Sequence, residues 1–251
     1  EAKRLGATTL AIVNVVGSAI AKGADDVLYT WAGPEIAVAT TKAFSAQMAV
    51  IYLLAGFLAH QLKAMPDARY AALIDALRAL PEQVAAVLSR ENMEKCQYFA
   101  SRCYGHHDAF YIGRNMDSAI CLEGSLKLKE IAYLHSEAYP AGELKHGPIS
   151  LIEQGTMVVA AATVAPLFEK MMANIREVKA RGADVLCVTL AENAEAAGKV
   201  ADNVFAVPAI YPALQPSLTL LPLQLFAYYV AVCRGCDVDK PRNLAKSVTV
   251  E

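Results

Sequence analysis

The sequence predicts an α/β fold built from two related copies of one domain, and three observations carry this prediction. Strand-like apolar runs alternate with helical patterns, the order typical of parallel sheets covered by helices. Residues 3–13 (KRLGATTLAIV) return as residues 179–189 (KARGADVLCVT), and residues 24–28 (ADDVL) return as residues 201–205 (ADNVF). An apolar helical pattern then follows each copy, at residues 40–62 and 217–233.

The first copy begins with residues 1–5, which predict the end of a helix stopped by Gly6. Residues 9–15 predict a buried strand, residues 18–22 a short helix and residues 24–30 a second strand. Residues 36–62 predict a long helix, whose apolar run at 48–59 is too short to span a bilayer and indicates a buried helix.

The second copy carries more elements than the first. Strands are expected at residues 109–112 and 155–162 and helices at 167–180 and 218–233, with a further helix from residue 120 that stops before Pro140. Nothing ahead of Lys3 corresponds to the elements at 109–180, so we expect the first copy to be incomplete, with about half of it absent.

A helical, amphipathic stretch separates the copies, and its break at Pro81 predicts a connecting helical hairpin. The expected organisation is therefore residues 1–65 as the C-terminal part of the first domain and 66–105 as a helical connector. Residues 106–235 form the second domain, and 236–251 form a tail over the active site.

The helix from residue 120 carries an unusual line of charges. At roughly 100° per residue, Glu123, Lys127 and Glu130 fall on one narrow stripe. The stripe is flanked by apolar side chains: Ile120, Ile131, Leu122, Leu126 and Tyr133. The pattern fits a structural ion ladder or an acid/base site, because charges in apolar surroundings must be paired or lose their charge.

The loop that follows favours the acid/base site. Glu143, Lys145 and His146 lie together in a turn-rich segment bounded by Gly142 and Pro148. Functional groups are often carried on loops held by rigid elements.

The composition narrows the class of partner. With 55% hydrophobic and 19% charged residues the chain is globular, and its net charge of -2 argues against nucleic acid or an anionic membrane as the main partner. The six cysteines follow no secretory segment, which predicts reduced thiols and a cytoplasmic protein. We expect no cofactor and no metal, because the Cys233-x-x-Cys236 pair lacks a second ligand pair.

The tail, residues 237–251, is a polar segment with scattered apolar residues. Leu244, Val248 and Val250 would be unnecessary in a free terminus, and Lys246 sits among small neighbours. We therefore expect a docked tail rather than a frayed one.

Four motifs together resemble one family. They are GPEIAVATTKAF at residues 33–44, EGSLKLKE at 123–130, EAYPAGELKHGP at 137–148 and DVDKPRNLAKSVTVE at 237–251. The chain resembles the C-terminal half of the glutamine:fructose-6-phosphate amidotransferases, also called glucosamine-6-phosphate synthases. That half is a pair of sugar isomerase (SIS) domains, so the resemblance implies flavodoxin-like three-layer folds with parallel sheets, the first one incomplete.

The resemblance implies an activity and residue roles. The family makes glucosamine 6-phosphate from fructose 6-phosphate and ammonia, and Glu130 would move the proton between C1 and C2 with Lys127 beside it. His146 would open the sugar ring from the neighbouring subunit of a homodimer, and Lys246 would form a Schiff base with the ketone. Such a lysine must be neutral to attack, so its pKa has to fall from about 10.4 toward roughly 7 to 8.

The resemblance also implies a sugar-binding set and two departures. Val38, Thr40 and Ala245 would line the sugar site, with Thr40 in place of the more usual serine. The family's phosphate-binding loop and its glutaminase domain lie upstream of Glu1, so the fragment alone is expected to be weakly active or inactive. Two alternatives stay open: a sugar-phosphate-binding SIS module without catalysis, and a fructosamine-phosphate deglycase of the same superfamily.

Overall fold

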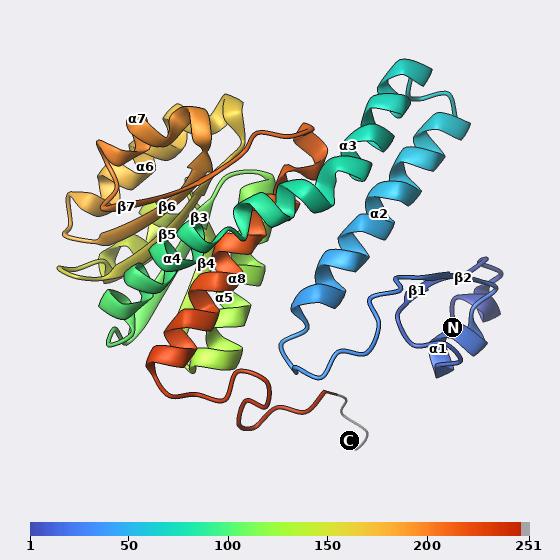
Figure 1. Ribbon diagram of the computed structural model, residues 1–251, viewed down its shortest axis with the longest axis horizontal. Coiled ribbons are helices and arrows are strands. Elements are labelled where there is room, and N and C mark those ends of the chain that lie inside the picture. Colours follow the sequence, from blue (N-terminus) through green and yellow to red (C-terminus); the bar gives the residue numbers. More distant parts are fainter. Residues whose placement is uncertain (247–251) are drawn as a thin grey trace. The chain divides into compact units, whose positions relative to one another are not determined.

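The computed structural model describes residues 1–246, and the chain divides into two compact units (Figure 1). The first unit is Glu1–Leu77 and the second is Arg78–Glu251. Both units contain parallel sheets flanked by helices, so the predicted α/β fold class is confirmed.

The first unit follows the predicted order of elements. Its short elements are η1 (Lys3–Leu5), β1 (Leu10–Val13), α1 (Ala19–Gly23) and β2 (Asp26–Tyr29), followed by the long helix α2 (Thr41–Gln61). Gly6 ends η1 with φ 81°, a left-handed conformation that glycine adopts without steric cost. Strands β1 and β2 pair in parallel, with Leu10 opposite Asp26.

Helix α2 differs from its prediction in two ways. It begins at Thr41 rather than at residue 36, and it is not a buried helix, because Ala43 and Gly56 are its buried residues. Within the apolar run at 48–59, Gly56 is buried and the other residues are half-buried or exposed.

The connector also differs from its prediction. Helix α3 (Asp67–Val87) continues through Pro81, and the break falls at residues 88–89, before α4 (Arg90–Cys103). Ser89 begins α4, because its hydroxyl accepts a hydrogen bond from the Asn92 backbone N–H. The two helices form no hairpin: α4 packs on α8 (Gln215–Cys233), and the start of α3 packs on α2, where Leu73 contacts Gly56.

The second unit is built on a five-stranded parallel sheet in the order β4-β3-β5-β6-β7. Renumbered within the unit, this is the order 2-1-3-4-5 of flavodoxin-like folds. The strands are β3 (Asp108–Gly113), β4 (His135–Pro140), β5 (Met157–Ala162), β6 (Asp184–Leu190) and β7 (Asn203–Val207).

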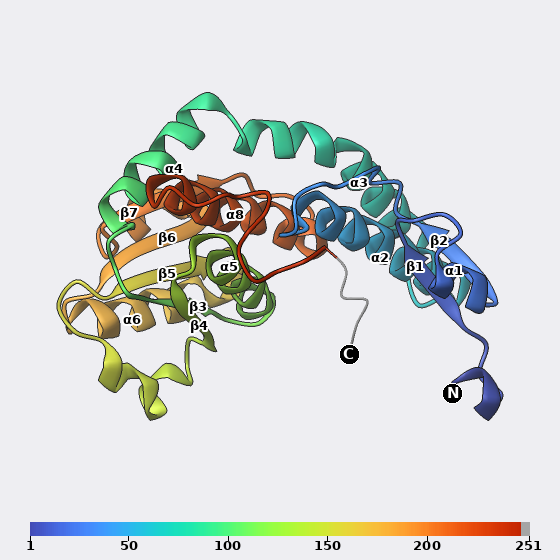
Figure 2. The same cartoon turned by 90° about the horizontal axis from the view of Figure 1, so that it is seen from below.

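Helices cover both faces of this sheet, which gives three layers (Figure 2). Helices α4, α5 (Met116–Ala132) and α8 lie on one face, and α6 (Phe168–Lys179) and α7 (Ala194–Gly198) lie on the other. Every residue of β5 is buried. Short 3-10 turns complete the unit: η2 (Leu144–His146), η3 (Pro148–Leu151), η4 (Ala165–Leu167), η5 (Ala191–Asn193) and η6 (Pro212–Leu214).

Helix α5 is shorter than predicted. It ends at Ala132, and Tyr133 adopts the left-handed conformation with φ 54° before β4 begins at His135. The helical reading of residues 133–139 was wrong, because pairing with β3 draws this segment into the sheet.

Among the residues that the structure describes, two helices are long and apolar enough to cross a membrane by length and composition. One is α2 and the other is the segment Pro212–Cys233, which contains α8. The second is mostly buried inside its unit, as predicted for the apolar run at 218–233.

Candidate active site

The predicted charge stripe exists on α5. Lys127 Nζ lies 2.7 Å from Glu130 Oε2 and 3.3 Å from Glu123 Oε1. The side chain of Lys127 is 5% exposed and that of Glu123 is 10% exposed, whereas that of Glu130 is 23% exposed. Glu130 is therefore the member of the stripe that solvent, and so a substrate, can reach.

Burial changes the acidity of Glu123. It raises the pKa of the Glu123 carboxyl, and the nearby Lys127 ammonium opposes this rise. Breaking such a pair by removing one partner is costly, because the remaining charge is left buried without compensation. Lys127 thus fixes a carboxylate at the protein surface while it is itself shielded from water.

The apolar flanks of the stripe are unequal. Ile120 and Ile131 are buried against the unit. On the other flank Leu122 is 61% exposed, and Leu126 is exposed too. Glu130 therefore stands between a packed side of α5 and an open apolar side.

A hollow of about 420 Å³ opens beside Glu130, between the end of α5 and the tail. Its lining residues come from both segments: Lys129, Glu130, Tyr133, Leu134, His135, Arg242, Asn243 and Leu244. The Arg242 backbone N–H donates a 2.7 Å hydrogen bond to the Tyr133 hydroxyl, and its guanidinium carbon lies 4.3 Å from the centre of the Tyr133 ring. These contacts attach the tail to the end of α5.

Sequence reasoning assigned no role to Tyr133 as a tail anchor or to Arg242. Tyr133 was interpreted as a flank of the helix stripe, and Arg242 stands in the quoted tail motif without a charge partner in the sequence pattern. The contact of the Arg242 guanidinium with the Tyr133 ring could have been predicted only by knowing that α5 ends at Ala132 and that the chain turns at Tyr133.

The other predicted catalytic residues lie outside this hollow. His146 is exposed at the end of η2, and it is absent from the hollow's lining. Ala245 and Lys246 follow the last lining residue along the chain and are exposed. Val248 and Val250, predicted to help dock the tail, lie outside the described residues.

Val38 and Thr40 belong to the first unit and lie just before α2. The Thr40 hydroxyl donates a 2.8 Å hydrogen bond to the Val38 carbonyl. Thr40 has φ 57° and ψ 50°, a left-handed conformation that is a genuine outlier for a β-branched residue. Strained residues of this kind cluster at ligand sites, so the backbone conformation agrees with the role predicted for Thr40, which stays a prediction.

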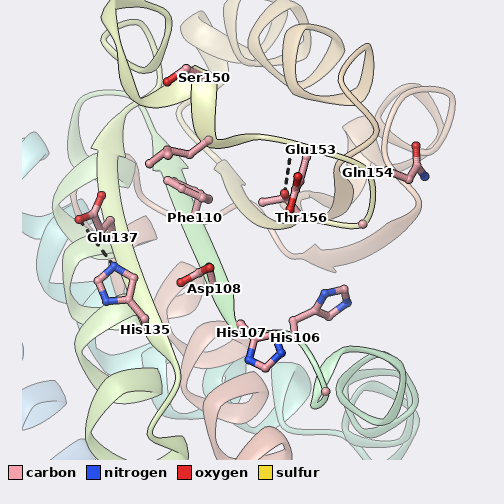
Figure 3. A pocket seen from close by; sticks show the side chains of 13 residues that line it. His106, His107, Asp108, Phe110, His135, Glu137, Ser150, Glu153, Gln154 and Thr156 are labelled. Atoms are coloured by element: carbon pink, nitrogen blue, oxygen red, sulfur yellow. Dashed lines mark hydrogen bonds and ion pairs between the residues drawn. The ribbon is translucent and has the colours of Figure 1, made fainter.

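A larger hollow of about 660 Å³ lies at the edge of the second unit's sheet where β3, β4 and β5 begin (Figure 3). His106, His107 and His135 line it together with acidic side chains. His135 Nε2 lies 3.7 Å from Glu137 Oε1, and the Tyr139 hydroxyl donates to Glu137 Oε2. This polar hollow shares His135 with the hollow beside Glu130, and no sequence motif indicated it.

Within residues 1–246, no three histidine, cysteine, aspartate or glutamate side chains form a group that could hold a metal ion. The six cysteines are free thiols, and Cys233 and Cys236 are partly exposed. The described site therefore offers carboxylates, amines and imidazoles for proton transfer.

Comparison with known proteins gives a consistent result. The family model described as SIS domain matches residues 1–56 and 104–234. The chain is 55% identical over 251 residues to the glutamine–fructose-6-phosphate aminotransferase [isomerizing] of Caldanaerobacter subterraneus subsp. tengcongensis, and 45% identical to that of a Thermus thermophilus strain. Both matches cover all of this chain and 41% of the relative. The chain therefore spans less than half the length of these curated relatives.

Solved structures agree with the sequence relatives. The C-terminal domain of glucosamine-fructose-6-phosphate aminotransferase from Francisella tularensis superposes with a TM-score of 0.88 at 32% identity, covering 92% of this chain and 65% of that one. Glucosamine-6-phosphate deaminase from Thermotoga maritima superposes with a TM-score of 0.68 at 25% identity, covering 96% and 66%.

Proposed function

Because the chain belongs to the SIS domain family, we propose that it carries the isomerising and aminating site that makes glucosamine 6-phosphate from fructose 6-phosphate and ammonia. The names of the relatives state an isomerising aminotransferase that acts on fructose 6-phosphate. The chain spans 41% of their length, and the family resemblance assigns the release of ammonia from glutamine to a separate N-terminal domain.

The observation that carries the proposal is the 2.7 Å pair of Lys127 and Glu130, set between a buried helix face and an open hollow. Moving a proton between C1 and C2 requires one carboxylate that reaches both carbons. A carboxylate on a rigid helix, held by a buried ammonium, keeps its position while the proton moves. Glu130 meets this requirement, and Lys127 positions it and balances its charge.

Lys246 is proposed as the Schiff-base residue. Its neutral amine adds to the C2 ketone of the opened sugar, the carbonyl oxygen leaves as water, and an imine remains. Support comes from the tail, since Arg242 is fixed to Tyr133 four residues before Lys246 and beside Glu130. Ala245, Val38 and Thr40 complete the proposed sugar-binding set.

His146 is proposed to open the sugar ring from a neighbouring copy of the chain. An imidazole can both accept and donate the proton near neutral pH. His146 is exposed and does not line the hollow beside Glu130 of its own chain, which supports action on a second subunit and hence a homodimer. The six free thiols support a cytoplasmic location.

Trapping of the imine with borohydride tests this proposal. The chain is incubated with fructose 6-phosphate and borohydride, then digested and analysed by mass spectrometry. The expected product is a peptide in which Lys246 has gained the mass of the sugar phosphate less one oxygen atom. The variant Lys246→Arg should lose the adduct, and Lys240→Arg, an exposed control in the same tail, should keep it. An adduct that persists in Lys246→Arg would overturn the assignment.

A further inference from the structure

A third hollow, of about 380 Å³, lies at the carboxyl edge of the second unit's sheet. Its walls come from the segments that follow β3, β5, β6 and β7 and from the start of α8. The strand order reverses between β3 and β5, and ligands of open parallel sheets bind at such reversal points. The hollow therefore lies where this fold offers a ligand site, and it is separate from the residues proposed for catalysis.

The position nearest the point where the strand order reverses is filled by a side chain of the protein itself. Asp117 stands in the first turn of α5 and is 1% exposed. Its Oδ2 accepts hydrogen bonds from the backbone N–H groups of Thr163, at 2.7 Å, and Val164, at 3.1 Å. Its Oδ1 accepts from the Thr163 hydroxyl at 2.6 Å.

The backbone at the end of β3 makes this arrangement possible. A Cβ atom on Gly113 would lie 2.5 Å from the Asp117 carbonyl carbon, so a residue with a side chain could not occupy this position without displacing the first turn of α5. The close approach brings the Asp117 carboxyl group to the loop that follows β5.

The groups that hold Asp117 are those that bind oxyanions. Two successive backbone N–H groups, one hydroxyl and the first turn of a helix form the usual surroundings of a bound phosphate. We propose that Asp117 is an internal anion, which occupies the oxyanion position of this hollow and closes it to phosphorylated ligands. The second domain is thereby prevented from competing for the sugar phosphate.

The rest of the hollow agrees with this assignment. Leu190, Ile210 and Pro212 are apolar, and Glu192 adds a second carboxylate. Among the described residues its lining includes no arginine or lysine, so the Thr163 and Val164 N–H groups and the Thr163 hydroxyl are the donors that would hold a phosphate in place of Asp117. The inference uses the second unit alone, and its failure would leave the proposed function untouched.

The test removes the internal anion and supplies an external one. Asp117→Ala should unfold at a lower Tm than the unchanged chain, and about 10 mM inorganic phosphate should raise that Tm by several degrees relative to chloride of equal ionic strength. The unchanged chain should shift by less than about 1 °C. Asp239→Ala makes the same change in charge at an exposed position and should behave like the unchanged chain. The double variant Asp117→Ala, Thr163→Ala should lose most of the response.

The proposal can still be tested if Asp117→Ala fails to fold. If Asp117→Ala is unfolded without phosphate, phosphate should restore its helical circular dichroism signal, and Asp117→Ser, which keeps one oxygen, should show the Tm response. The proposal is overturned if neither variant responds to phosphate. It is equally overturned if the unchanged chain shows the same response as Asp117→Ala, since the carboxyl group would then exclude nothing.

Discussion

Two carboxylates flank Lys127 on the same helix stripe inside the second unit. The contact of 2.7 Å to Glu130 is tighter than that of 3.3 Å to Glu123, and Glu130 is the more exposed partner. The two carboxylates therefore differ in position. Glu123 lies in the interior, whereas Glu130 lines the hollow, where it is proposed to take up and return the proton.

Glu123 makes stability depend on pH. Burial raises its pKa in the folded protein above the ordinary value of 4.5, so the folded state binds the proton more tightly than the unfolded state does. The free energy of unfolding should therefore fall as pH rises from below 4.5 through the raised pKa, and then level off. Glu123→Gln lacks this proton and should lose that part of the pH dependence.

Urea unfolding at several values between about pH 4 and pH 7 measures the effect. The difference in unfolding free energy between Glu123→Gln and the unchanged chain should move in favour of the variant as pH rises. Glu195→Gln, changed at a position that is 88% exposed, is the control and should show no such trend. If the unfolding free energies of Glu123→Gln and of the unchanged chain changed in parallel with pH, the assigned role of burial would be contradicted.

Replacing Thr40 by glycine should change stability and activity in opposite directions. A strained left-handed conformation costs on the order of 1 to 3 kcal/mol, and glycine adopts it freely. Thr40→Gly should therefore stabilise the protein by about 1 kcal/mol and yet weaken the trapping of the sugar at Lys246. Thr41→Gly, inside α2, should instead destabilise by up to about 1 kcal/mol. Equal destabilisation by both changes would show that position 40 is unstrained.

The residues of the stripe were predictable because helical periodicity depends on spacing alone. The contacts at the end of the site could not be predicted from spacing. Arg242 meets Tyr133 across more than one hundred residues of sequence, and such a contact depends on where α5 stops. The roles assigned to His146 and Lys246 came from the family resemblance, and the structure brings neither into the hollow's lining.

Helix α5 is held by an unusually close approach to α8 at Gly124. A Cβ atom there would lie 2.8 Å from Leu223 Cδ1 and 3.0 Å from Tyr111 Cε1. This closeness fixes the helix that carries Lys127 and Glu130 against the core of the unit. The same helix also packs on β3 and β4.

Gly124→Ala should accordingly destabilise the protein by about 1 to 3 kcal/mol, because the added methyl group overpacks a tight contact. Gly198→Ala is the matched control in α7, since its Cβ atom would come no nearer than 4.0 Å to a neighbour. That change should be neutral or slightly stabilising. Urea midpoints measure both, and a neutral Gly124→Ala would show that α5 can shift away from α8.

Element boundaries were predicted less well than element types. Strand β4 was missed because residues 133–139 continue an apolar helical pattern, and only pairing with β3 decides their conformation. Pro81 was predicted to end a helix, yet α3 continues to Val87 and the break follows the cap at Ser89. Local patterns gave the type of each element, and long-range pairing or capping set its end.

At the scale of the whole molecule, the two units differ in how much of their apolar surface they cover. The second unit buries a five-stranded sheet between two helix layers, whereas the described sheet of the first unit has two strands and only Ala43 and Gly56 of α2 are buried. The internal repeat predicted the α/β class of both units. It could not predict the exposure of α2, because burial depends on which neighbours surround a helix.

The central claim is that Glu130 moves the proton between C1 and C2 of the sugar. The most direct measurement follows fructose 6-phosphate by NMR, with and without ammonium, in the presence of the 251-residue chain or its variants. We expect conversion to glucose 6-phosphate, or to glucosamine 6-phosphate with ammonium, and a loss of at least about 100-fold in Glu130→Gln. Glu94→Gln, an exposed control, should keep the rate. Equal conversion by Glu130→Gln would contradict the claim, whereas no conversion by the folded unchanged chain would agree with the expected need for the family's upstream phosphate-binding loop.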